Sequence, residues 1–237
     1  MIYVSLFTYN IGRGVVCMSA YESIKKSILH GEYPPKMRLT EEYLAKQLNM
    51  SRTPIREALR QLESEGLIVS MKRGVSVRHF TKKDIEQIYD LRTLLEGYAA
   101  AQAAIHRTQA DIKEMSEANW AYEEAIDTYF DTGSTTIEYI LEINHRFHDA
   151  IIKASQNQHI YSHISKVVVV PLIFRSFYWF NEYQMRHSLD VHKTLLTAIE
   201  HQDTERARAS MHEHIYHGRD QVLLNMDTID DSYTKTT

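Results

Sequence analysis

The stretch MSRTPIREALRQLESEGLI, residues 50–68, carries the clearest structural signal in the chain. Ser51 can cap a helix, and Pro54 lies in the first turn, where its missing N–H costs nothing. Gly66 ends the helical pattern. Between these signals the apolar residues recur at helical spacing and predict one buried stripe, formed by Ile55, Ala58, Leu59 and Leu62. The stretch therefore predicts a short amphipathic helix.

Two shorter helical patterns precede this helix. The first stops at Gly31, and its inner face is formed by Tyr21, Ile24 and Ile28. Pro34 and Pro35 then force an extended crossing. Thr40 can cap a second short helix, whose inner face is formed by Leu44, Ala45 and Leu48. We therefore expect three helices before Gly66.

A small hairpin follows the three helices. Two short apolar runs, residues 67–69 and 75–77, are separated by a basic turn of Lys72, Arg73 and Gly74. Three short helices and a β-hairpin wing predict a winged helix-turn-helix domain over residues 18–80. The fold class that we expect is mainly α, with this domain joined to an all-α helical bundle.

The third helix has the side chains of a DNA-reading element. Arg52, Arg56 and Arg60 are spaced four apart, beside the apolar stripe. A helix in the major groove needs guanidinium groups that reach guanine edges or phosphates while the opposite face stays packed. Ser51 and Thr53 at its N-terminal end can bind phosphate oxygens, helped by the helix dipole. The alternative interpretation is a solvated basic face.

Two further features favour DNA as the partner. Arg73 and Gly74 at the tip of the wing suit a narrow minor groove, because glycine permits a close approach. Residues 1–80 carry twelve basic and seven acidic residues, whereas the remainder carries 15 basic and 24 acidic ones. A basic N-terminal part and an acidic remainder indicate that only the N-terminal part approaches a polyanion.

The rest of the chain predicts helices. Thr81 and Asp84 form a capping box for a long helix, with an expected inward face of Ile85, Ile88, Leu91, Leu95 and Tyr98. Further helical segments continue to residue 225, with a break expected near His187–Ser188 and a kink at Pro171. We assign residues 81–225 to a helical ligand-binding and dimerisation domain and residues 226–237 to a disordered tail.

The first residues resemble neither a membrane span nor a good signal peptide. Residues 1–17 are apolar but interrupted by Asn10, Gly12 and Arg13, and they lack a basic start. We interpret them as an N-terminal extension, with translation from Met18 as an alternative. The only cysteine is Cys17, which excludes a disulfide framework and fits a reducing cytoplasm, so we expect a cytoplasmic protein that does not bind membranes.

Three histidines and one amide suit a metal site. Asn144 and His148 are four apart and share one helical face, while His192 and His214 lie on two further predicted helices. Three imidazoles and an oxygen donor inside a bundle suit a divalent transition metal, such as zinc or nickel. With 13 histidines in the chain, a chance trio is the competing interpretation. The remaining candidates, which we assign to surface or packing roles, are His145, His212 and His217.

The stretch from Tyr21 to Val77 resembles the winged helix-turn-helix of the GntR family of bacterial regulators, and residues 50–68 are similar to its signature. The resemblance implies that Arg52 and Arg56 read bases, while Ser51, Thr53 and the wing contact the backbone and the minor groove. There are two departures from the family. Glu42 stands where the fatty-acid-responsive branch has a DNA-contacting arginine, and Lys36 replaces the usual glycine after the two prolines.

The helical region resembles the FCD effector domain of the same family's FadR branch, in residues 90–100, 144–157 and 191–215. The resemblance implies a metal held by an Asp-x-x-x-His pair and two later histidines, at the positions of Asn144, His148, His192 and His214. Asn144 replaces the aspartate with a neutral and weaker donor. Arg92 is similar to the family's carboxylate-binding arginine, with an ion pair to Glu96 as the alternative. Arg175 is a second candidate for effector binding.

These observations predict a transcriptional regulator rather than an enzyme. We expect a homodimeric repressor that binds a double-stranded DNA operator and is controlled by a small carboxylate effector in the helical domain. One alternative is a metal-dependent hydrolase with an accessory DNA-binding domain, although no general base is evident beside the histidines. Another is an architectural DNA binder without an effector.

Overall fold

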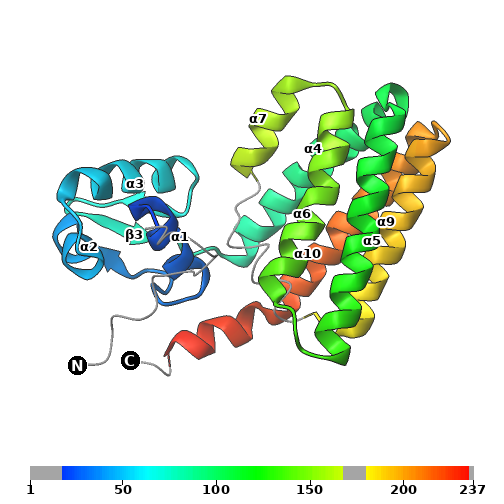
Figure 1. Ribbon diagram of the computed structural model, residues 1–237. Helices are drawn as coiled ribbons and strands as arrows, with labels where there is room; N and C mark the ends of the chain where they lie inside the picture. Colours follow the sequence, from blue (N-terminus) through cyan, green and yellow to red (C-terminus); the bar gives the residue numbers. More distant parts are fainter. Residues whose placement is uncertain (1–17, 168–179, 235–237) are drawn as a thin grey trace, which may run out of the picture. The chain divides into compact units, whose positions relative to one another are not determined.

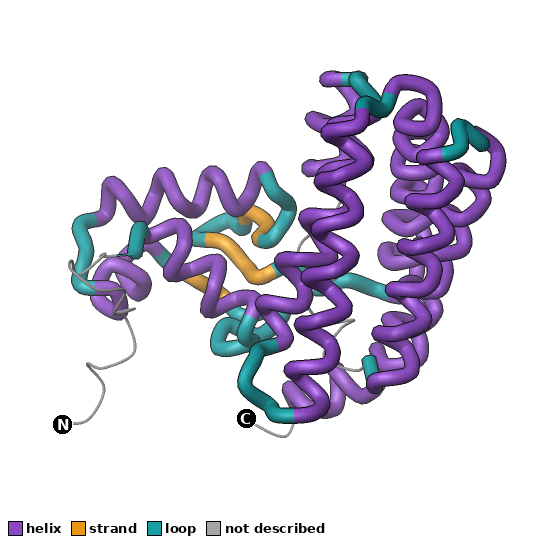
Figure 2. The backbone as a smooth tube through the Cα atoms, turned by 45° about the vertical axis from the view of Figure 1, so that its right-hand side comes forward, coloured by secondary structure: helices purple, strands orange, loops and turns teal. Residues whose placement is uncertain are grey.

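The computed structural model describes residues 18–167 and 180–234, and the chain divides into two compact units. One unit holds the residues up to His79, and the other holds those from Phe80 onward. Strands occur in the first unit, while the described part of the second is built from helices (Figure 2). This confirms the predicted fold class: a helix-turn-helix domain with a small sheet, followed by an all-helical domain.

The described part of the first unit has three helices and a three-stranded antiparallel sheet (Figure 1). In chain order its elements are α1 (Ala20–Leu29), β1 (Arg38–Leu39), α2 (Glu41–Leu48), α3 (Arg52–Ser64), β2 (Ile68–Ser70) and β3 (Val75–Val77). β2 and β3 form the predicted hairpin, with Val69 opposite Ser76. β1 pairs with the other edge of β3, with Leu39 opposite Val75. The extended crossing before α2 is therefore a third strand.

Both predicted cap residues of this unit stand at helix starts, but only one of them makes a capping hydrogen bond. The Thr40 side chain accepts a hydrogen bond from the Tyr43 amide and so starts α2. Ser51 is the N-cap residue of α3, but its side chain accepts no capping hydrogen bond from the described first turn of that helix. The predicted stripe of α3 is buried, and the fully buried core of the unit includes Ile24, Leu39, Leu44, Ile55 and Leu62.

Lys36 has a backbone conformation that favours glycine. Its φ is 69°, in the left-handed region that costs an L-residue with a side chain about 1 kcal/mol or more. The Lys36 amide donates to the Val77 carbonyl at 2.9 Å, which fixes this turn against β3. The turn is thus built without the glycine that is usual there in the family that this stretch resembles.

The second unit is a helical bundle. Its described helices are α4 (Lys82–His106), α5 (Gln109–Asp131), α6 (Ile137–Ala154), α7 (Gln158–Val167), α9 (Glu182–Glu200) and α10 (Thr204–Thr234). α4, α5, α6, α9 and α10 lie side by side, with α4 packed against α10 and α5 against α6 (Figure 1). Capping boxes start α4 at Thr81, as predicted, and also α5 at Thr108 and α9 at Asn181. Among the described residues, every helix is too short or too polar to cross a lipid bilayer.

Two helix boundaries differ from the sequence prediction. α9 runs unbroken through His187 and Ser188, because its start is set by the Asn181 capping box and no glycine or proline interrupts it. α10 continues to Thr234, beyond the last residues with a clear helical pattern, because no glycine or proline follows residue 225 to end it. The kink predicted at Pro171 lies outside the described residues.

The apolar stripe predicted to face inward on α4 is only partly buried: Ile85 is fully buried, Ile88 and Leu95 are half-buried, and the other two members are exposed. Leu91 is 48% exposed and Tyr98 41%, and Leu94 and Ile105 lie on the same side with 66% and 48% exposed. The buried face of α4 instead carries small and polar residues, among them Thr93, Glu96, Gly97 and Ala100. The periodicity was correct, but small side chains face the bundle because α10 packs closely there: a Cβ added at Gly97 would overlap the His212 imidazole.

Candidate functional site

The side chains predicted to contact DNA lie on the exposed face of α3. Arg52, Arg56 and Arg60 are exposed, as are Ser51 and Thr53 at the start of the helix. The opposite face of α3 is buried against α1 and α2. A helix held in this way presents a basic outer surface, as reading of the major groove requires.

Two of these arginines are paired with acids from the first turn of α2. Arg56 donates from Nε and Nη2 to the two carboxylate oxygens of Glu41, at 2.8 and 2.9 Å. Arg52 approaches Glu42 more loosely, with Nη2 3.8 Å from Oε2. The pairing is a feature of the site that the sequence analysis missed, since it depends on the angle at which α2 and α3 cross.

The wing tip has a packing role as well as an exposed surface. Gly74 has a φ of 83°, and a Cβ there would lie 2.6 Å from the Leu39 carbonyl oxygen. Only glycine therefore fits the close approach between the wing and β1. Arg73 is exposed, and its carbonyl accepts a hydrogen bond from Arg38 Nε at 2.9 Å.

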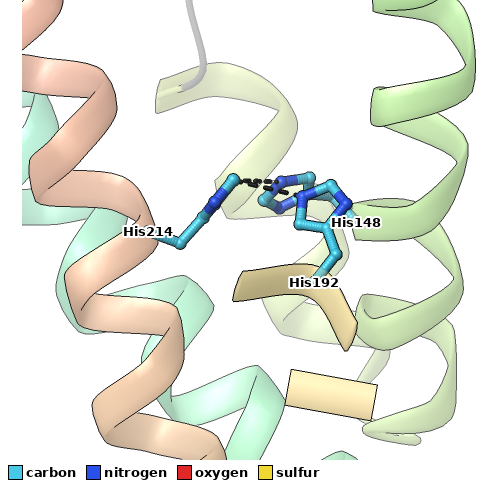
Figure 3. A group of neighbouring side chains, drawn as sticks. All are labelled: His148, His192 and His214. Carbon is cyan, nitrogen blue, oxygen red and sulfur yellow. Dashed lines mark hydrogen bonds between the residues drawn. The ribbon is translucent and has the colours of Figure 1, made fainter. Parts of the chain in front are cut away.

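The three predicted histidine ligands converge inside the helical unit. His148 comes from α6, His192 from α9 and His214 from α10, and the three imidazoles point toward one another (Figure 3). His148 Nε2 lies 3.0 Å from His214 Nε2, which lies 3.3 Å from His192 Nε2. One ligand atom from each residue falls within 4.8 Å of the others. Three nitrogens gathered in this way can hold one metal ion.

The protonation of the cluster suits metal binding. Burial, reinforced by the neighbouring His214 and His148, holds the pKa of His192 well below its usual value. Burial and His148 likewise lower the pKa of His214. Both rings are therefore neutral at neutral pH, the form in which imidazole binds a metal. Phe147 stacks on His192 at a centroid distance of 4.2 Å and fixes the plane of that ring.

A buried carboxylate on α4 orients His148. Glu96 Oε2 lies 2.9 Å from His148 Nδ1, and Glu96 Oε1 accepts from Arg92 Nε at 2.8 Å. Burial alone would raise the pKa of Glu96, but Arg92 and His148 outweigh it and lower the pKa to about 2. The carboxylate accepts the Nδ1 proton and so leaves His148 Nε2 free to face the other imidazoles. The ion pair considered for Arg92 is formed, and Arg92 also lies over the Tyr89 ring.

Asn144 has the burial expected of a ligand. It is 6% exposed, one helical turn before His148 on α6, and its Oδ1 has no hydrogen-bond partner among the described residues. A buried carbonyl oxygen without a partner is costly unless an ion, a water or a ligand satisfies it. This donor set, three imidazole nitrogens and one unsatisfied oxygen, fits a divalent transition metal.

The remaining candidates lie elsewhere. His145 is 64% exposed at its side chain and lies near Asp149, and His212 packs over Gly97. His217 contacts His187 and Phe180 rather than the cluster. Arg175 lies outside the described residues. The sequence predicts Glu96 only as an ion-pair partner of Arg92, from their i+4 spacing. Nothing in the sequence indicates its contact with His148.

Each of the two units matches a known protein family. Residues 18–77 match the bacterial regulatory proteins of the gntR family, and residues 87–217 match the FCD domain. The first match covers the helix-turn-helix and its wing, and the second covers the bundle with the histidine cluster. The protein is thus a DNA-binding regulator with a helical second domain. It belongs to the GntR family and carries an FCD domain.

Individual relatives align over most of the chain. The regulator YdhC of Bacillus subtilis is 29% identical over 198 residues, which cover 83% of this chain and 86% of that protein. The gluconate operon repressor of the same organism is 28% identical over 208 residues, 86% and 83% of the two chains. The solved structure of Escherichia coli McbR matches with a TM-score of 0.68 and 25% identity, over 90% of this chain and 96% of that one. These relatives are transcriptional regulators, not enzymes, and the chain is a DNA-binding transcriptional regulator.

Proposed function

We propose that the protein is a repressor whose operator binding is controlled by a small organic acid bound in the helical unit. The observation that carries this proposal is the convergence of His148, His192 and His214, with a buried oxygen of Asn144, one helical turn before His148, that lacks a partner among the described residues. The cluster lies in the helical unit and not in the unit that carries the helix-turn-helix. It is explained by a metal and a ligand that the bundle is built to receive.

In this proposal, His148, His192, His214 and Asn144 hold a divalent metal such as zinc or nickel. The bound metal supplies a positive centre to which a carboxylate can coordinate. Arg92, oriented by Glu96, adds a guanidinium that suits a carboxylate, and Arg175 is retained as a second candidate.

Further polar atoms support a polar ligand in the same interior. Asn119 on α5 is buried, and both polar atoms of its amide lack a hydrogen-bond partner within the described parts of the chain. Tyr122 on α5 and Ser188 on α9 are also buried, and their hydroxyls interact with each other. The Tyr122 ring lies 5.5 Å from that of His192, which is one turn after Ser188. Buried polar groups normally have partners, so the Asn119 amide is expected to bind a hydroxyl or carbonyl group of the effector, directly or through water.

DNA reading is assigned to the first unit. Arg52, Arg56 and Arg60 are proposed to enter the major groove, Ser51 and Thr53 to bind phosphates, and the wing at Arg73 and Gly74 to reach the minor groove. Their exposure supports these roles, which follow from the family to which the chain belongs.

A homodimer is proposed to place two reading units on two half-sites. The exposed apolar stripe on α4 supports it, because Leu91, Leu94, Tyr98 and Ile105 form one side of a single helix. Large apolar side chains exposed together on one side of a helix often mark a protein–protein interface. Effector binding regulates the dimer if its affinity differs between DNA-competent and DNA-incompetent states.

Two relatives support repression and a polar metabolite as the effector class. Their names describe repressors of a gluconate operon and, in Paenarthrobacter nicotinovorans, of a D-xylose utilisation operon, the latter as a probable function. We propose the same direction of control here, with release from the operator when the effector binds.

The test is operator binding by the purified, metal-analysed protein. The operator is first selected from a randomised duplex library by the protein itself. Its affinity is then titrated against a panel of small organic acids, with and without a chelator. We expect one acid to weaken operator binding at least about ten-fold, within the usual range of allosteric coupling, and chelation to abolish the effect.

Matched variants locate the sensor. His214→Ala should remove both metal and acid response but retain operator binding, while His145→Ala, an exposed histidine outside the cluster, should behave as the wild type. If operator binding is tight and specific but is unchanged by every acid and by the chelator, the proposed sensor is rejected. If the response to the acid survives chelation, only the proposed role of the metal is rejected.

A further inference from the structure

Arg56 is held on one side by a carboxylate from the neighbouring helix. Its Nε and Nη2 donate to Glu41 Oε1 and Oε2 at 2.8 and 2.9 Å, which is a two-point fork between planar groups. The Arg56 side chain is still 56% exposed and that of Glu41 33%. The pair therefore lies at the surface of the reading element, where a DNA base would approach it.

The fork leaves the end of the guanidinium group available. A guanidinium carries five N–H groups, of which the contact with Glu41 engages one from Nε and one from Nη2. Nη1 and Nη2 still offer two parallel N–H groups at the end of the side chain. This pair matches the O6 and N7 acceptors that guanine presents in the major groove. Arg56 can thus bind Glu41 and a guanine at the same time.

Glu41 occupies a well-defined position. It is the first residue of α2, whose start is fixed by the Thr40 cap. Leu44 on α2 and Ile55 on α3 are fully buried, and the two helices pack against each other. A carboxylate positioned in this way orders the long Arg56 side chain before DNA binds, so less conformational entropy is lost on binding.

The adjacent pair lacks this geometry. Arg52 reaches Glu42 by one contact at 3.8 Å, and the two side chains are 62% and 83% exposed. Glu41 and Glu42 carry the same charge in the same helical turn, but only Glu41 forms a fork with its arginine. Glu42 therefore serves as a control for the effect of the negative charge alone.

We propose that Glu41 is a specificity-determining residue of the DNA interface. It holds Arg56 so that the end of the guanidinium reads a guanine, and its negative charge weakens attraction to the phosphates of non-operator DNA. The inference rests on the proposed role of Arg56 in reading a base. It adds that discrimination at that base depends on an acid that does not itself contact the DNA base.

The experiment compares base preferences of the full-length protein and four variants. Wild type, Glu41→Gln, Glu42→Gln, Arg56→Ala and the double variant Glu41→Gln/Arg56→Ala each select from a randomised duplex library, and the bound fraction is sequenced. Affinity for a scrambled duplex is measured in parallel. Circular dichroism checks that each variant is folded, which is expected because the exchanged side chains are exposed or partly so.

We expect Glu41→Gln to reduce the preference for guanine at one position by about ten-fold, within the range of one good bidentate base contact. It should also bind the scrambled duplex more tightly. Glu42→Gln should share the second effect but keep the base preference. The double variant should discriminate no worse at that position than Arg56→Ala, because the two residues act through one contact.

The outcomes separate this inference from the proposed function. If Arg56→Ala leaves every base preference unchanged, Arg56 does not read a base. The proposed base-reading role of Arg56 and the role of Glu41 are then both wrong. If Arg56→Ala relaxes one position while Glu41→Gln matches Glu42→Gln, Arg56 reads the base without help and only the role of Glu41 is rejected. A double variant that discriminates less well than Arg56→Ala would also reject that role, since Glu41 would then act through another residue.

Discussion

At the scale of single residues, Asn144 is the position where this FCD domain departs most clearly from the ligand pattern that its sequence resembles. Its amide oxygen is buried and lacks a partner among the described residues. A neutral amide gives a weaker bond to a divalent cation than a carboxylate does, because it brings no charge to the site. The identity of this one side chain is therefore expected to set how tightly the metal is held.

The variant Asn144→Asp should bind Ni²⁺ or Zn²⁺ about ten-fold more tightly or better, which corresponds to about 1.4 kcal/mol for the added charge–charge interaction. The measurement is a competition titration against a metal-binding dye. His145→Asp is the control, since it adds a carboxylate at the next residue, whose side chain is 64% exposed. Equal affinities for the wild type and Asn144→Asp would show that residue 144 is not a ligand.

The cluster also shows what sequence can and cannot predict at this scale. His148, His192 and His214 were predicted as one group, and the structure brings them together. The match to a family motif made this possible, because spacing alone cannot choose three histidines among 13. Glu96 was missed as a partner of His148, since the two are 52 positions apart and meet only through the packing of α4 on α6.

At the scale of elements, the helix starts are local and follow the sequence. Thr81 both accepts from the Asp84 amide and donates to the Asp84 carboxylate, so its hydroxyl stabilises the first turn of α4. Ser51 precedes α3 without such a bond to the described residues of that turn. Two N-cap residues with the same chemistry therefore differ in what they contribute to their helices.

Replacing these two residues should separate stability from DNA binding. Thr81→Ala should lower the free energy of unfolding by about 1 kcal/mol, the usual cost of losing an N-cap. Ser51→Ala should change it by less than about 0.5 kcal/mol but weaken operator binding, if the hydroxyl binds a phosphate. Chemical denaturation and operator titration measure the two effects. Equal losses of stability in both variants would mean that Ser51 does cap α3 in solution.

Elements that depend on distant partners were predicted less well. β1 has only two residues, and its pairing with β3 joins Leu39 to Val75 across the intervening helices. Nothing in a local pattern marks so short a strand. On α4, Leu91 and Tyr98 were assigned to the core because they recur at helical spacing with Ile85, but they are exposed. Periodicity identifies an apolar face but not what covers it.

At the scale of the whole molecule, that face is a reason to expect a dimer. A soluble protein rarely leaves a contiguous row of large apolar side chains in water.

We expect the native protein to be a dimer in multi-angle light scattering, and Leu94→Glu to shift it toward the monomer, because a buried unpaired charge is costly at an interface. The monomer should bind its operator less tightly, since it offers one reading unit instead of two joined ones. Trp120→Glu on α5 is the matched control, because Trp120 is 67% exposed and Leu94 66%. A Leu94→Glu variant that stays dimeric would place the interface elsewhere, and loss of the dimer in Trp120→Glu alone would move it to α5.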